Sequence, residues 1–152
     1  PATGTGADPA TLPGAGAAGG IGFGAYLLGA RQVSGAAYFA ELAGLPGALA
    51  GASLAVTGEG SLDSQTLTGK LPLVVAAHAR TAGVPAVAAV GRCLLGASEW
   101  RGAGFSAVHA LIDRDPGCAT DPELSARRLR LLGEELATAR TADPGDGRTR
   151  VP

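Results

Sequence analysis

The sequence predicts an α/β fold in which a parallel sheet carries helices on its faces. Three short apolar runs, at residues 52–57, 84–90 and 105–112, have the length and composition of buried strands. Segments with helical spacing separate these runs, and strands that alternate with helices favour a parallel sheet. The runs are apolar throughout rather than alternating, as expected of strands covered on both faces.

The first 50 residues are expected to be rich in loops and helices. Residues 1–13 are interpreted as a loop, and a glycine-rich turn leads from there into an apolar helix over about residues 19–28. A second helical stretch follows, with large apolar side chains at helical spacing. Gly44 and Pro46 are expected to stop it.

The remaining elements follow in order along the chain. The strand at 52–57 is expected to end in a glycine turn. The next helix covers residues 71–83, with Pro72 in its first turn and Gly83 at its end. A short helix is predicted near residues 98–102, and a long amphipathic helix begins at Asp121 or Thr120 as its cap. The polar tail, residues 141–152, is interpreted as disordered.

Composition and charge exclude several classes of partner. The formal charge is −1 and the basic residues are dispersed, whereas nucleic-acid binding needs a clustered basic face. Residues 12–30 are uncharged but too rich in glycine for a membrane span. The two cysteines, Cys93 and Cys118, have no metal-ligand spacing and indicate no disulfide framework. A cytoplasmic protein with no membrane or nucleic-acid partner is therefore expected.

One stretch after the first predicted strand, "TGEGSLDSQTLTGK", combines several chemical groups. It ends in Lys70, the only lysine of the chain, and places Glu59 and Asp63 among glycines. Loop N–H groups, the start of the next helix and the ammonium could bind a phosphate or carboxylate. The two carboxylates could hold a divalent cation, or one could take a proton from a hydroxyl. These groups suit phosphoryl transfer.

A structural interpretation of the same residues stays open. The glycines could only form a tight turn, Asp63 could only cap that turn, and Lys70 could be a solvated side chain. The stretch does not match a P-loop, because Leu71 follows Gly69-Lys70 and Ser64 stands where the motif needs glycine.

A second glycine pattern, Gly14-x-Gly16-x-x-Gly19, has the spacing of a dinucleotide fingerprint. That fingerprint needs a strand directly before it, and "TGADPATLP" has no strand character. An NAD-dependent oxidoreductase is therefore the less favoured alternative. The loop could still bind an anion, or its glycines could only allow close helix packing.

Four further polar residues are considered for the site. His78 and His109 are interpreted as structural histidines within a helix and a strand. Asp113 and Asp115 follow the third strand, at the same edge of the sheet as the stretch described above. They could approach the site, or form a turn with Pro116-Gly117.

Two motifs of the sequence resemble signatures of bacterial glycerate kinases. "TGEGSLDSQTLTGKLP" resembles the signature TGEG-x-x-D-x-Q-T-x-x-GK-x-P, and "LPGAGAAGGIGFG" resembles the PGAGAAGG loop. Their order, their spacing and the following "GVPAVAAVGR" also fit that family. The positions that match the two motifs are Gly58, Glu59, Gly60, Asp63, Gln65, Thr66, Gly69 and Lys70 in the first, and Gly14, Gly16, Gly19 and Gly20 in the second.

The resemblance implies a reaction and its participants. It implies ATP-dependent phosphorylation of D-glycerate to 2-phosphoglycerate, with Mg²⁺, by the C-terminal portion of a two-domain α/β enzyme. The expected catalytic residues are Asp63 and Glu59, as base or Mg²⁺ ligands, and Lys70, as an anchor for phosphate or carboxylate. The matched glycines, with Gln65 and Thr66, are expected to bind substrate or phosphate.

The resemblance also implies a division into domains. Residues 1–50 would end the second, inserted domain, residues 51–140 would form part of a Rossmann-like domain, and residues 141–152 would be a tail. The "PDSFKGS"-like start of that family is absent from the sequence, so a missing N-terminal half of the same enzyme is expected as a partner. A non-catalytic module that binds anions or nucleotides remains the main alternative.

Overall fold

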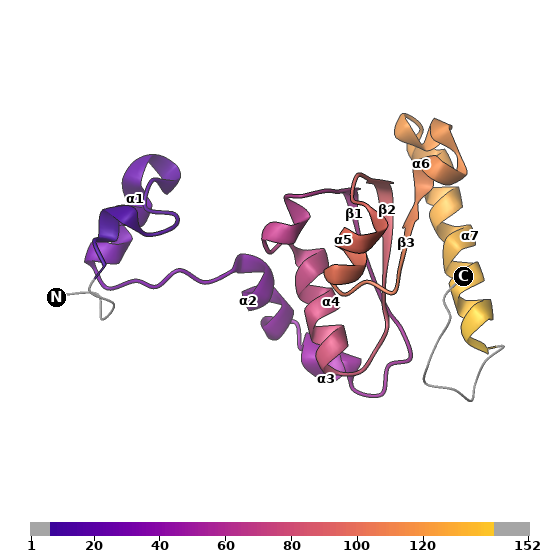
Figure 1. Ribbon diagram of the computed structural model, residues 1–152, viewed down its shortest axis with the longest axis horizontal. Coiled ribbons are helices and arrows are strands. Elements are labelled where there is room, and N and C mark those ends of the chain that lie inside the picture. The colour runs from indigo at the N-terminus through magenta and orange to yellow at the C-terminus, as the bar shows by residue number, and fades with distance from the viewer. Residues whose placement is uncertain (1–6, 142–152) are drawn as a thin grey trace. The chain divides into compact units, whose positions relative to one another are not determined.

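The computed structural model describes residues 7–141 (Figure 1). Contacts divide the chain into two units, Pro1–Gly35 and Ala36–Pro152, and each is described by itself. The domain boundary expected after residue 50 stays a prediction. Of the tail expected at 141–152, Thr141 is the last residue of the final helix, and residues 142–152 lie outside the described residues.

The first unit contains the 3₁₀ turn η1 (Pro9–Thr11) and the helix α1 (Ala17–Leu27). The expected helix at 19–28 is present, but its regular part begins after Gly20. Ala18, Gly19 and Gly20 have φ values of 51°, 70° and 97°, which lie in the left-handed region. Two of these three residues are glycines, for which this conformation carries no steric cost.

The second unit begins with two short helices, α2 (Gly35–Leu42) and α3 (Leu45–Leu49). Gly44, with φ of 71°, separates them as expected. The prediction that Pro46 also stops the helical stretch is wrong, because Pro46 lies in the first turn of α3. A proline is tolerated there because the first N–H groups of a helix have no partner within it.

The sheet has three parallel strands in the order β1 (Ala55–Leu62), β2 (Ala86–Cys93) and β3 (Ala107–Ala110). Ala55 pairs with Ala86 at the start of the β1–β2 ladder, and Val87 pairs with Ala107 in the next ladder. The predicted α/β class with a parallel sheet and flanking helices is confirmed.

The first strand is longer than predicted. A glycine turn was expected after Thr57, but β1 continues through Gly58, Glu59 and Gly60 to Leu62. A Cβ atom at Gly58 would lie 2.3 Å from the carbonyl oxygen of Ala89 in β2. Gly58 therefore permits a close approach of the two strands, and the prediction that it begins a turn is wrong.

The helices between the strands agree with the predictions, except near the third strand. The 3₁₀ turn η2 (Thr66–Thr68) precedes α4 (Leu71–Thr81), and α5 (Ala97–Gly102) follows β2. The third strand ends at Ala110 rather than residue 112, because α6 (Leu111–Arg114) begins there.

The last helix is capped by an aspartate. The 3₁₀ turn η3 (Pro116–Ala119) leads to α7 (Pro122–Thr141). Oδ1 of Asp121 accepts hydrogen bonds from the N–H groups of Glu123 and Leu124, both at 2.9 Å. Asp121, one of the two predicted caps, therefore satisfies two N–H groups of the first turn.

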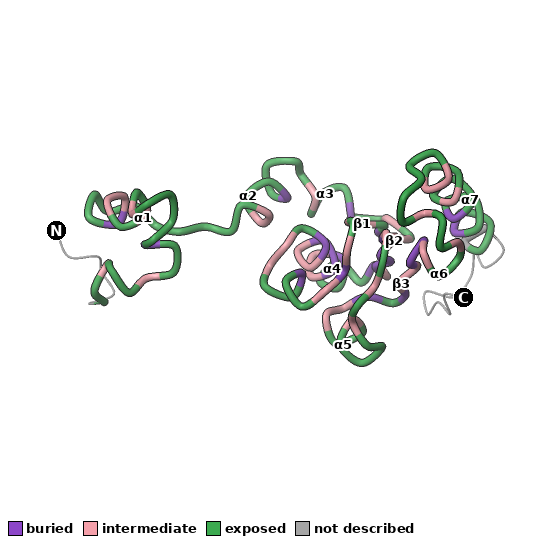
Figure 2. Tube along the Cα trace, turned by 90° about the horizontal axis from the view of Figure 1, so that it is seen from above, coloured by how far each residue is buried: buried purple, intermediate pink, exposed green. Residues whose placement is uncertain are grey.

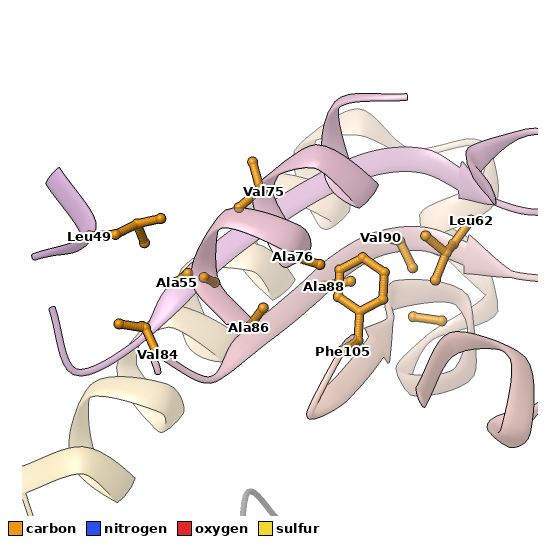
Figure 3. Packing of buried hydrophobic residues seen from close by; sticks show 12 residues of the cluster. Leu49, Ala55, Leu62, Val75, Ala76, Val84, Ala86, Ala88, Val90 and Phe105 are labelled. Carbon is orange, nitrogen blue, oxygen red and sulfur yellow. The ribbon is translucent and has the colours of Figure 1, made fainter. Parts of the chain in front are cut away.

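Helices cover both faces of the sheet (Figure 1). On one face, Ala86, Ala88 and Val90 of β2 pack with α4 residues and Phe105 (Figure 3). On the other face, Val87 and Ala107 pack against Leu132 and Leu136 of α7. Buried residues therefore concentrate on the strands and on the inner sides of α4 and α7 (Figure 2).

The face under α7 is incompletely covered near β1. An apolar groove of about 410 Å³ runs between β1 and α7. Val56 on β1 is 54% exposed and Leu129 on α7 is 45% exposed. β1 is also an edge strand of the sheet, as far as the described residues show. Exposed edges and apolar faces favour association between molecules.

No helix in the part of the chain that the structure describes combines the length and the apolar content needed to cross a bilayer.

Candidate functional site

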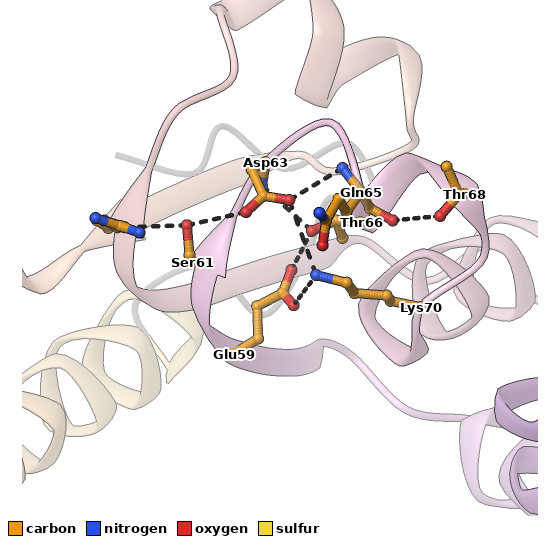
Figure 4. A network of polar contacts seen from close by, with 8 residues as sticks. Glu59, Ser61, Asp63, Gln65, Thr66, Thr68 and Lys70 are labelled. Carbon is orange, nitrogen blue, oxygen red and sulfur yellow. Dashed lines mark hydrogen bonds and ion pairs between the residues drawn. The ribbon is translucent and has the colours of Figure 1, made fainter.

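Three charged side chains meet where β1 ends and α4 begins (Figure 4). Glu59 lies on β1, Asp63 follows the last residue of that strand, and Lys70 is the N-cap residue of α4. The connection is tight, because Thr66 N–H donates to the carbonyl of Asp63 at 2.9 Å. Gly69, with φ of 105°, then reverses the chain into the helix.

Lys70 lies between the two acids. Its Nζ is 3.8 Å from Oε2 of Glu59 and 3.8 Å from Oδ1 of Asp63. The Glu59 and Asp63 side chains are 17% and 26% exposed, and that of Lys70 is 41% exposed. With both acids ionised, two negative charges and one positive charge leave the cluster with one net negative charge.

Thr66 forms hydrogen bonds with both acidic residues from a buried position. It is fully buried, and its hydroxyl donates to Oε1 of Glu59. The same hydroxyl accepts a hydrogen bond of 3.2 Å from the backbone N–H of Asp63. One buried hydroxyl therefore fixes the side chain of one acid and the backbone of the other.

Asp63 is held as a carboxylate. Partial burial would raise the pKa of this carboxyl, but the hydrogen bonds and charge around it outweigh that effect and lower the pKa below 3.8. The N–H of Gln65 donates to Oδ1 at 3.0 Å, and the Ser61 hydroxyl donates to Oδ2 at 3.2 Å. The ammonium of Lys70 adds to the same effect.

The donor set of the cluster is compatible with Mg²⁺, the metal that the sequence resemblance implies. Glu59 and Asp63 offer hard carboxylate oxygens on either side of Lys70, each 3.8 Å from its Nζ. Within residues 7–141, no three His, Cys, Asp or Glu side chains gather into a metal-binding group. Two carboxylates suffice for Mg²⁺, which keeps several waters and binds substrate phosphates together with one or two carboxylates.

The other residues of the predicted site have backbone or surface positions around this cluster. Gly58 and Gly60 lie within β1, and Gly58 pairs with Ala89 in the ladder. Gln65 is exposed and contributes its N–H to Asp63. A binding role for these three residues and for Gly69 stays a prediction.

The second predicted loop, with Gly14, Gly16, Gly19 and Gly20, belongs to the first unit. The loop folds back on α1, because the Tyr26 hydroxyl donates to the carbonyl of Pro13 at 2.6 Å. η1 precedes the loop, so the strand that a dinucleotide fingerprint requires is not found in the described residues before it. This observation disfavours the oxidoreductase interpretation.

The two aspartates after β3 have different surroundings. Asp115 accepts a hydrogen bond from Gly117 N–H at 3.1 Å and pairs with Arg128 at 2.7 Å. These contacts support the interpretation of Asp115 as a turn residue. The pKa of its carboxyl is lowered, chiefly by the hydrogen bond from Arg128. Asp113 is exposed on α6.

The histidines are in contact with residues outside the charged cluster. His78 lies 3.8 Å from Glu41 of α2. His109 lies 3.4 Å from Arg114, and burial followed by the charge of Arg114 lowers its pKa. These contacts agree with the structural role expected of both.

Two residues that border the cluster were not predicted from the sequence. Ser61, on β1, donates to Asp63, and Arg92, on β2, donates from Nε to the Ser61 hydroxyl at 3.1 Å. Ser61 and Arg92 are partners in the parallel ladder. Only the register between the strands brings them together, and a single sequence does not give that register.

Comparisons with known proteins agree on one family. The model of the glycerate kinase family matches residues 2–141. An uncharacterized protein of Mycobacterium bovis is 45% identical over 133 residues, which are 88% of this chain and 35% of that protein. A glycerate kinase of Halalkalibacterium halodurans is 36% identical over 110 residues, which are 72% of this chain and 29% of that protein.

A solved structure also matches. It is described as a candidate glycerate kinase 2 from Salmonella typhimurium LT2, with 29% identity and a TM-score of 0.50. The match covers 82% of this chain and 34% of the other. The chain thus spans about a third of the length of the relatives it matches. The family match extends over nearly the whole sequence, and the chain belongs to the glycerate kinase family.

Proposed function

We propose that this chain is the part of an ATP-dependent glycerate kinase that carries the Glu59–Asp63–Lys70 cluster. The reaction is transfer of the γ-phosphoryl group of ATP to D-glycerate, giving 2-phosphoglycerate. The observation that carries the proposal is the position of Lys70 between two carboxylates at the carboxyl end of β1. In open parallel sheets, ligands bind beyond that edge.

The charge of the cluster supports a metal-dependent reaction. The two carboxylates of the cluster would repel the phosphates of a nucleotide, and a divalent cation would offset that repulsion. Asp63 would hold Mg²⁺ together with the phosphates of the nucleotide, and the cation would neutralise charge on the phosphate oxygens. The lowered pKa of Asp63 favours its role as a cation ligand over that of a base.

The chain's own groups then have distinct tasks. Lys70 supplies an ammonium for the phosphoryl oxygens, where charge must be balanced during transfer. A new P–O bond forms to the glycerate hydroxyl oxygen while the bond from the γ-phosphorus to the bridging oxygen of ATP breaks. The hydroxyl proton passes to a carboxylate. Asp63 alone can hold the cation, because Mg²⁺ binds one or two carboxylates, and Glu59 is then the candidate to take the proton. Thr66 holds Glu59 in place for this task.

Phosphorus NMR tests the proposal directly. The chain is incubated with Mg²⁺, ATP and D-glycerate in two conditions. In the first it is alone, and in the second a polypeptide is added that covers the part of a family relative that this chain does not match. A phosphomonoester signal that is lost in Lys70→Ala and kept in Arg80→Ala, an exposed arginine of α4, is expected. The position of that signal identifies the phosphorylated hydroxyl. No product under either condition would refute the kinase proposal.

Nucleotide binding without any product would instead support the non-catalytic module. Titration of the chain with Mg²⁺-ATP, followed by heteronuclear NMR at residues 57–70, separates these two outcomes.

A further inference from the structure

Asp63 is held from two sides by cations that come from different elements. Lys70 approaches Oδ1 directly, at 3.8 Å. Arg92 reaches Oδ2 through one intermediate, the hydroxyl of Ser61. We propose that Arg92, acting through Ser61, is a positioning residue that fixes the carboxylate of Asp63 in the candidate site. The proposal rests on the proposed function, because it assigns a role in that same site.

The hydrogen bonds have a defined direction. A guanidinium has N–H donors and no acceptor, so Arg92 Nε can only donate to the oxygen of Ser61, at 3.1 Å. The single hydroxyl proton of Ser61 is then free to point at Oδ2 of Asp63, at 3.2 Å. Arg92 therefore selects the orientation of the hydroxyl that donates to the carboxylate.

The strand register makes this arrangement specific. Ser61 and Arg92 are partners in the β1–β2 ladder, so the backbone of both strands sets the distance between their side chains. Asp63 follows β1 by one residue and has left the ladder. Its side chain depends on hydrogen bonds for its orientation, and the relay supplies the one on Oδ2.

Both oxygens of Asp63 must be oriented if this carboxylate is to bind a cation next to Lys70. Oδ1 is fixed by the N–H of Gln65 and lies near Lys70. Without the bond to Oδ2, the side chain keeps the N–H of Gln65 and the ion pair with Lys70, both on Oδ1. The side chain is then free to exchange between staggered χ1 rotamers. Loss of Arg92 should therefore loosen Asp63 while its direct partners Ser61, Gln65 and Lys70 stay in place.

The first experiment measures the orientation of Asp63 itself. Three-bond couplings by NMR report whether χ1 of Asp63 occupies one rotamer in the unaltered chain. In Arg92→Ala and Ser61→Ala the couplings should average, whereas Ser61→Thr, which keeps the hydroxyl, should retain the single rotamer. Arg80→Ala is the control for loss of an exposed arginine. Unchanged couplings in Arg92→Ala would overturn the proposal.

The second experiment asks whether orientation matters for turnover. In the complete enzyme, Arg92→Ala should lower kcat by about two- to tenfold, the effect of one partly exposed hydrogen bond, with little change in the KM for glycerate. The double variant Arg92→Ala/Ser61→Ala should be no slower than Ser61→Ala alone, because both act in one relay. Additive losses, or an unchanged kcat, would contradict the proposal.

The two experiments separate failure of the proposal from failure of the proposed function. If the unaltered enzyme forms no phosphomonoester, the kinase assignment fails. The couplings of Asp63 still decide whether Arg92 positions this carboxylate. If turnover is present and the couplings do not respond to Arg92→Ala, only the positioning role fails.

Discussion

Gly58 is expected to tolerate no side chain, because the two strands approach each other closely at this residue. A Cβ atom there would lie 2.3 Å from the carbonyl oxygen of Ala89, and real Cβ atoms essentially never come closer than 3.0 Å. Gly58→Ala must therefore move the strands apart by about 0.7 Å. A ladder bond of about 2.9 Å would stretch to about 3.6 Å, beyond hydrogen-bonding distance.

The expected loss of stability follows from that movement. Weakening about two ladder bonds, each with a net contribution of about 0.5–1.5 kcal/mol, lowers the free energy of unfolding by about 1–3 kcal/mol. With an m-value of about 1–3 kcal/mol/M, the urea midpoint should fall by about 1 M. Urea unfolding followed by circular dichroism measures this shift.

Gly60→Ala provides the matched control. Gly60 lies on the same strand, but a Cβ atom added there meets nothing within 4 Å. Because alanine restricts the unfolded chain more than glycine does, this variant should be neutral or slightly stabilised, by up to about 1 kcal/mol. Equal midpoints for the two variants would refute the close-approach explanation of Gly58.

Three further changes test the site and the last helix. Thr66→Val leaves Glu59 and the Asp63 N–H without their buried partner and should destabilise the chain by about 1–3 kcal/mol in urea unfolding, whereas Thr66→Ser should restore most of the loss. Asp121→Ala removes the cap of α7 and should cost about 1 kcal/mol, seen as a lower Tm. The pKa of Asp115 in the folded chain lies below 3.8, so its ionised form contributes to the free energy of unfolding above pH 3.8, and this contribution is lost as the pH falls through the folded pKa. The difference in stability between the unaltered chain and Asp115→Asn should therefore close in acid. A difference that stays constant with pH would contradict a stabilising pair with Arg128.

The general architecture could be predicted from the sequence because it depends on local pattern. Apolar runs separated by helical segments predicted the parallel sheet, and Gly83 and Asp121 marked helix ends correctly. The end of β1 was misplaced because glycine indicates a turn more often than a close strand contact. Gly58 has the second role, which depends on β2, a strand about 30 residues away in the sequence.

The part of the candidate site that is local in sequence could be predicted. Glu59, Asp63 and Lys70 are close in sequence, so one motif identified all three, and the structure brings their charged groups within ion-pair distance. Arg92 lies on another strand, and only the register of the β1–β2 ladder places it next to Ser61 at the site. The burial of Thr66 could not be predicted either, because a polar residue in an expected loop gives no local signal of burial.

The position of Lys70 makes the site accessible to chemical labelling. Since the sequence contains one lysine, an amine-selective reagent modifies no other side chain of this kind. The Lys70 side chain is 41% exposed and its ammonium lies between two acids, so a bulky acyl group there would separate Glu59 from Asp63. Mass spectrometry of one tryptic region would then report how far a bound nucleotide shields the cluster, without any assay of turnover.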